Sequence, residues 1–341
     1  MKLQVPIYND IEGIVLHKRI KNYLDRNCVK AKVSNSSETK YPKNTRVIDW
    51  DTESGTIPIY EPEASNPYGI EPIRFLIVVA EGTKDELKLM RQLSLILNER
   101  PIAFPKEGIR HLWKTTESRA PRFVSASGLA YWNAVHNAIR ILERAISELS
   151  VLDQFIHFWR SFNALYSYYY KAEIGKDPRK ERISEETMFN HFLQKFFGND
   201  SKSKPIVQFF LSRYDLKWMC DLKIEAMALT KEGYLELINK GVIRREKPGK
   251  EEEHQWVFEG VDWKEFLTFR KGLEFWDYYN RKDFPSALKE VIAFIYDAGR
   301  SKLFHGSEPY FIEEELAFLH ASAETLYQLL VTSMPKILET A

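Results

Sequence analysis

The chain has 341 residues, a length that predicts two domains, and its 49 basic residues nearly balance 48 acidic ones to give a formal net charge of +1. This balance argues against a protein that coats nucleic acid nonspecifically, since such a protein needs a large cationic excess; a local basic groove remains compatible with it. Hydrophobic residues make up 44% of the chain, enough to form real cores, which excludes a wholly disordered protein.

The sequence shows no sign of a membrane, metal or cofactor site. Its longest apolar run, Phe75–Ala80, is far shorter than the roughly 20 residues that span a bilayer, and residues 1–10 lack the apolar core of a signal peptide. We therefore expect a cytoplasmic protein. Cys28 and Cys220 stand far apart without C-x-x-C spacing, and glycine-rich nucleotide loops are absent, so we expect neither a metal nor a cofactor.

Residues 1–120 predict an α+β domain, for which we expect a sensor or regulatory role. Strand-like patterns occur at 45–50 and 56–60, a proline-containing loop at 61–72, a buried strand at 75–80, a helix carrying Leu87 to Leu97, and a short returning strand at 102–104. No group of side chains in this domain points to a particular chemistry.

Residues 121–341 predict an all-α domain. Apolar residues recur at helical spacing, which places helices at 129–149, at 151–171, from 284 to about 306, and from 311 to 334. In the second of these the stripe is aromatic, with Phe155, Phe158 and Phe162 three and four residues apart, which is typical of packing between helices.

Residues 184–280 read as an insertion within this helical domain. A helix at 230–240 is followed by a strand that carries Arg244 and Arg245, a charged loop, and a second strand at 255–258. This is the order of a winged helix, in which the arginines would contact RNA. A surface hairpin with solvated charges has the same order, and we prefer the hairpin because charge runs usually face solvent.

The segment most suggestive of chemistry is Arg300-Ser301-Lys302-Leu303-Phe304-His305-Gly306. Arg-x4-His is weak as an isolated pattern, but this is its only occurrence in the chain. It falls at the end of the penultimate predicted helix and directly before the last one, which is rich in leucine.

Together with the aromatic helix FIHFWRSFNALYSYYY at 155–170, this motif resembles the HEPN superfamily, closest to its Apea-like branch. That family is an all-α bundle with Arg-x4-6-His near the end of a late helix. The resemblance covers about 150 residues and leaves out both the first domain and the insertion. It implies a metal-independent endoribonuclease of the toxin or antiphage defence type, with Arg300 and His305 as catalytic residues, RNA as substrate and a possible regulatory protein as partner.

Elementary chemistry fits this role. A histidine exchanges protons near neutral pH, so His305 could take the proton of a ribose 2′-hydroxyl, while Arg300 orients the phosphate and offsets its developing charge. Five residues turn an ideal helix side chain by about 140°. Arg300 and His305 therefore lie on different faces of a regular helix. They can act together only if the helix distorts or if two chains combine their residues. HEPN nucleases resemble the second case, so we expect a homodimer with a composite site.

Two residues depart from the family pattern and favour an alternative. Ser301 stands where Asn, Asp or His is more usual, and Asn163 where glutamate is common. They keep open a catalytically inactive HEPN module that dimerises and binds RNA, nucleotide or a partner protein. If the enzyme hypothesis holds, Ser301, Asn163 and Arg160 support the site and Lys302 helps bind RNA; otherwise His305 caps a helix end and Arg300 is an ordinary surface residue.

Overall fold

The computed structural model resolves the chain into two compact units, one of Met1–Leu165 with Tyr310–Ala341 and one of Tyr166–Pro309. We call them the first and the second unit and describe each by itself. The structure describes residues 2–27, 31–36, 66–80, 93, 95–119, 126–175, 181–213, 234–235, 238–239, 241, 243–246, 255–258, 274–297 and 313–340.

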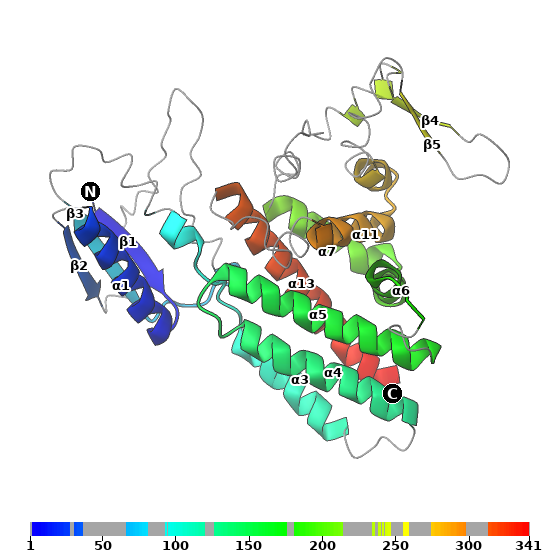
Figure 1. The fold of residues 1–341 in the computed structure, drawn as a ribbon, viewed down its shortest axis with the longest axis horizontal. Helices are drawn as coiled ribbons and strands as arrows, with labels where there is room; N and C mark the ends of the chain where they lie inside the picture. Colours follow the sequence, from blue (N-terminus) through cyan, green and yellow to red (C-terminus); the bar gives the residue numbers. More distant parts are fainter. Residues whose placement is uncertain are drawn as a thin grey trace. The chain divides into compact units, whose positions relative to one another are not determined.

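The first unit begins with a small antiparallel sheet covered on one face by a helix (Figure 1). Strand β1 (Lys2–Ile7) and strand β2 (Ala31–Ser36) flank the central β3 (Arg74–Ala80), and helix α1 (Asp10–Arg26) connects the two edge strands. In register, Val5 lies opposite Leu76 and Val33 opposite Val78. The predicted strand at 75–80 is confirmed; those at 45–50 and 56–60 lie outside the described residues.

Helix α1 lies close to the sheet because its second turn carries a glycine. Asn9 caps the helix by accepting a hydrogen bond from the Glu12 amide at 2.7 Å. A Cβ atom on Gly13 would lie 2.9 Å from Cγ2 of Ile7 and 2.8 Å from Nη2 of Arg74. Leu16, Ile20 and Leu24 follow on the same face and are buried against the sheet. Leu93 and Leu97, from the predicted helix before residue 100, complete this core.

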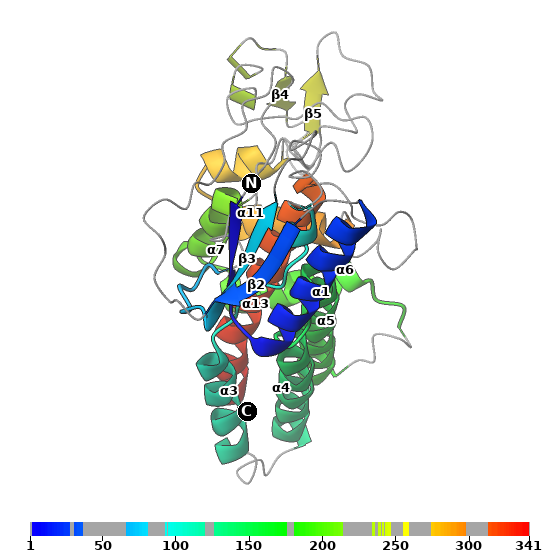
Figure 2. The same cartoon turned by 90° about the vertical axis from the view of Figure 1, so that its left-hand side faces the viewer.

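Where the first unit is described, it has four further helices of defined bounds: α3 (Lys106–Arg119), α4 (Ala126–Ala145), α5 (Val151–Ile174, up to Leu165) and α13 (Glu313–Thr340). Helix α13 packs against α3 and α4, which also pack against each other (Figure 2). The predicted helices at 129–149, 151–171 and 311–334 are confirmed with shifted ends. Most of their predicted inner residues are buried, as shown by Phe155, Phe162 and Leu326, whereas Trp132 and Ile146 are half-buried.

The prediction of a strand at 102–104 is wrong. Ile102 pairs with a side chain instead of a strand. The Gln154 side chain of α5 accepts a hydrogen bond from the backbone amide of Ile102 at 2.7 Å and donates one to the backbone carbonyl of Ile102 at 3.0 Å. One buried glutamine thus satisfies both backbone groups that a neighbouring strand would otherwise bind.

The second unit is built around helix α11 (Phe284–Phe294), which packs against α7 (Asp200–Arg213) and α6 (Glu185–Phe197). A hairpin of β4 (Ile243–Glu246) and β5 (Gln255–Phe258) belongs to the same unit. The predicted domain boundary near residue 120 falls inside the first unit, between α3 and α4. The second unit thus contains α11 together with α6 and α7, which belong to the predicted insertion.

Candidate functional site

The helix that leads to the Arg-x4-His motif is well defined at its start. The side chain of Asp283 accepts a hydrogen bond from the Ser286 amide at 3.1 Å, and Pro285 occupies the first turn of α11, as the sequence predicts. The α-helix ends at Phe294 and continues as a π-helical turn over residues 295–297. The predicted residues Arg300, Ser301, Lys302 and His305 lie outside the described residues.

The π-helical turn is the last described part of the chain before the motif. Its hydrogen bonds span five residues instead of four, and such turns are frequent at functional sites. Residues 295–297, which precede the motif, are therefore not a regular α-helix.

The two predicted supporting residues lie on α5. Arg160 is exposed and Asn163 is half-buried, and their spacing of three residues places them on one side of the helix. Their neighbours Phe158 and Phe162 are fully buried. The two polar side chains thus mark the border between the packed and the open side of α5.

The predicted RNA-binding pair Arg244 and Arg245 lies on β4, opposite Val257 and Trp256 of β5. Helical residues at 234–235 and 238–239 precede β4. The predicted pair of strands is confirmed. Because a winged helix and a plain surface hairpin both contain such a pair, it does not distinguish between them.

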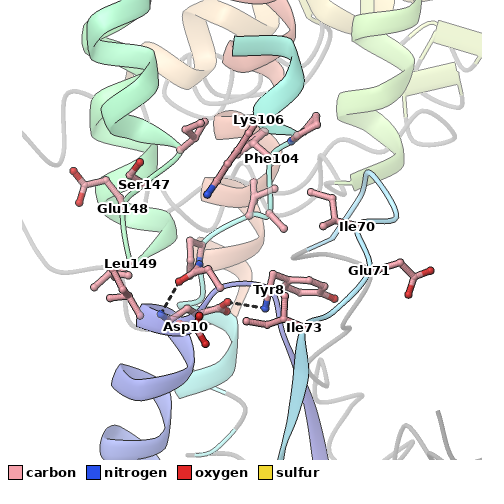
Figure 3. Close-up of a pocket in the computed structure, with 18 of the residues that line it drawn as sticks. Tyr8, Asp10, Ile70, Glu71, Ile73, Phe104, Lys106, Ser147, Glu148 and Leu149 are labelled. Carbon is pink, nitrogen blue, oxygen red and sulfur yellow. Dashed lines mark hydrogen bonds between the residues drawn. The ribbon is translucent and has the colours of Figure 1, made fainter. Parts of the chain in front are cut away.

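A pocket of about 750 Å³ lies within the first unit, where the connection between β1 and α1 meets the start of α3 (Figure 3). Residues 70–73, the segment before α3 and the connection between α4 and α5 complete its wall. Pockets that bind small molecules usually measure about 300–1,000 Å³. The size of this cavity is therefore that of a small-molecule site.

A buried ion pair supports the wall of this pocket. Glu12 and Arg100 are 4% and 2% exposed, and Nε of Arg100 donates to Oε1 of Glu12 at 2.7 Å. Arg100 also donates to the carbonyl of Pro6 at 2.6 Å, and Glu12 accepts from the amide of Tyr8 at 3.2 Å (Figure 3). These bonds join β1, the start of α1 and the segment that leads to α3.

Apolar side chains line the pocket but remain accessible to solvent. Ile11, Ile73 and Leu149 are 63%, 49% and 37% exposed, although all three line the cavity. Ile70 and Ile146 are half-buried beside them. Exposed aliphatic side chains gathered around one cavity are typical of a ligand site.

One carboxylate of the pocket wall, that of Glu148, lies next to a histidine. Oε1 of Glu148 lies 3.0 Å from Nε2 of His157 and 3.5 Å from Nε of Arg144. Burial lowers the pKa of His157 below its ordinary value of 6.5, and this outweighs the opposite influence of the Glu148 charge. His157 is therefore mainly neutral at pH 7.

Comparison with protein-family models, with curated proteins and with solved structures yields no match. Among the residues that the structure describes, no group of three histidine, cysteine or acidic side chains is placed to hold a metal ion. Within the same residues, no helix is long and apolar enough to cross a membrane.

The sequence analysis missed the pocket and its ion pair. One local signal was present, since Asn9 and Glu12 have the spacing of a capping box and predict the start of a helix. Nothing local predicts that Glu12 pairs with Arg100, because 88 residues separate them and only the fold brings them together.

Proposed function

We propose that the chain is a metal-independent endoribonuclease of the HEPN type, in line with the resemblance of its sequence. The observation that carries the proposal is the Arg300-x4-His305 motif between α11 and α13. A defence or toxin-like role in the cytoplasm is part of the proposal, since an uncontrolled ribonuclease harms the cell that makes it.

The helices around the motif support this proposal. Helix α11 precedes the motif and loses its regular α-helical form at 295–297, close to Arg300. The leucine-rich helix α13 follows it, and the aromatic stripe of α5 is buried, as a helical bundle requires. The sequence features that the resemblance rests on thus occur with the expected secondary structure where the structure describes them.

The proposed reaction needs two functional groups. The His305 imidazole accepts the proton of a ribose 2′-hydroxyl, and the resulting oxygen attacks the adjacent phosphorus. The bond from phosphorus to the 5′-oxygen breaks, and this oxygen takes a proton from an imidazolium or from water. Arg300 donates hydrogen bonds to the phosphate as negative charge develops on it. The products are a 2′,3′-cyclic phosphate and a 5′-hydroxyl, and DNA is inert because it lacks the attacking group.

The proposed site is composite and contains the motifs of two chains. The +1 net charge requires that positive charge concentrate at this site and that the acidic excess lie elsewhere, because RNA binds cationic surfaces. Sedimentation at increasing protein concentration tests the assembly, and a chain that stays monomeric contradicts a composite site.

The activity is tested with purified full-length protein and RNA in the presence of EDTA. Wild type should release fragments with cyclic phosphate ends, while Arg300→Ala and His305→Ala should lose cleavage by at least a hundredfold. Arg140→Ala on α4 and His111→Ala on α3 remove exposed side chains of the same types and should cleave like wild type. RNA binding by a dimer without cleavage by wild type favours the inactive HEPN module, whereas equal cleavage by all five proteins indicates a contaminant.

A further inference from the structure

We propose that the pocket at the start of α1 and α3 binds a small carboxylic acid with an apolar body. The cavity, its aliphatic walls and the Lys106 side chain carry this inference. It is independent of the proposed ribonuclease activity and holds whether or not the chain cleaves RNA.

The apolar walls indicate the body of the ligand. Ile11, Ile73 and Leu149 come from three separate segments of the chain, yet all line one cavity of about 750 Å³. Each leaves more than a third of its surface open to water. Burying such surface stabilises a complex by about 25 cal/mol per Å². A hydrocarbon chain or an aromatic ring therefore gains binding energy here.

The free positive charge of the pocket indicates the polar end of the ligand. Lys106 begins α3, and its side chain reaches into the space between Phe104 and Ser147 (Figure 3). Within the described residues its amino group takes part in no ion pair. Arg110, one turn further along α3, lines the same pocket. An ammonium group beside apolar walls favours a carboxylate through a charge-assisted hydrogen bond.

The carboxylates of the wall favour an acidic ligand over an amine. Glu12 is paired with Arg100, and Asp10 lies 3.2 Å from Nη2 of Arg74. Glu148 lies 3.5 Å from Nε of Arg144, and Glu107 lies 4.0 Å from Nη1 of Arg110. Glu71 points away from the cavity (Figure 3). An amine would have to displace an existing partner or lie next to the free Lys106, and both cost binding energy.

The pocket is preformed, which lowers the entropy lost on binding. Arg100 holds Glu12, which lines the pocket. Asn66 holds another lining residue, Ile70, in a turn, since its side chain accepts from the amide of Ile70 at 2.8 Å and donates to the carbonyl of Ile70 at 2.9 Å. Gly69 completes this turn with a φ of +62°, a conformation that residues with a side chain rarely adopt.

Isothermal titration of the full chain with two matched probes, phenylbutyrate and phenylbutylamine, tests the inference. Phenylbutyrate should bind and phenylbutylamine should bind at least about tenfold more weakly. Lys106→Met keeps the apolar stem and removes the charge, so it should weaken phenylbutyrate binding about tenfold or more. Leu149→Ser and Ile11→Ser change exposed wall residues and should also weaken binding while leaving the fold intact.

Two control variants separate the pocket from the general surface. Lys114→Met changes an exposed lysine of the same helix α3, and Ile14→Ser changes a 65% exposed isoleucine of the same helix α1; neither residue lines the pocket. Both should bind phenylbutyrate like wild type. The inference fails if phenylbutyrate does not bind, if the amine binds equally well, if Lys106→Met binds as tightly as wild type, or if the controls weaken binding to the same extent.

Discussion

The two parts of the first unit bury their polar groups in different ways. Around the sheet, a charged pair, Glu12 and Arg100, joins β1 to α1 and to the segment before α3. Among the helices, α13 also buries Glu324, but several buried polar groups are neutral hydroxyls that bind backbone carbonyls, as when Ser161 donates to Ala138 and Thr116 to Leu112. Removing one partner of a buried charged pair costs far more than removing a neutral hydroxyl. The Glu12–Arg100 pair should therefore be more sensitive to substitution than these buried hydroxyls.

The largest effect is expected for Glu12→Gln. It keeps the size of the side chain but leaves the buried Arg100 without its counter-charge, which should lower the free energy of unfolding by about 3–5 kcal/mol. Urea unfolding measures the loss, and hydrogen exchange of peptides from α1 and β3 localises it.

The matched control for this variant is Glu99→Gln, which breaks the half-exposed ion pair between Arg19 and Glu99. Exposed pairs contribute about 0–1 kcal/mol, so Glu99→Gln should stay within that range. Equal losses for the two variants would contradict the contrast between a buried and an exposed pair.

The second-largest loss of stability is expected for Gln154→Ala, which removes the neutral side chain that binds the backbone amide and carbonyl of Ile102. An amide and a carbonyl both lose their partner in a buried place, and each costs about 1–3 kcal/mol. Ser161→Ala serves as the comparison, because it removes a single hydrogen bond and should cost about 1 kcal/mol. Urea unfolding of the two variants measures the difference, and a Gln154→Ala loss no larger than that of Ser161→Ala contradicts the role assigned to Gln154.

The sequence predicted those elements whose signal is local. The periodic burial of Phe155, Phe158 and Phe162 and the start of α11 at Phe284-Pro285 follow from neighbouring residues alone, and both are confirmed. The strand predicted at 102–104 failed because the partner of Ile102 is a side chain 52 positions away. The pocket could not be predicted either, since Ile11, Ile73 and Leu149 come together only through the packing of separate segments.

A smaller loss is expected for Gly13→Ala, which tests the close approach of α1 to the sheet. The new methyl group would meet Ile7 and Arg74 at less than 3.0 Å, and such overpacking costs about 1–3 kcal/mol. Alanine is the better helix former by about 1 kcal/mol, so the net destabilisation should be about 0–2 kcal/mol. Thermal unfolding measures it, and a clear gain in stability would show that the sheet does not constrain this position.

The smallest effect is a pH dependence from the pair of His157 and Glu148, a titratable pair on the helical side. Because burial lowers the pKa of His157, the unfolded chain binds a proton more readily than the folded chain below about pH 6.5. The contribution of this histidine is fully present above that pH and is lost as the pH falls toward the lowered value in the folded state. His157→Gln should therefore flatten the loss of stability between pH 7 and pH 5, measured by urea unfolding at each pH. Glu148→Gln removes the charge that favours the imidazolium and should shift the titration of His157, followed by NMR, to still lower pH. A shift to higher pH in this variant would mean that the Glu148 charge does not stabilise the imidazolium across the 3.0 Å contact.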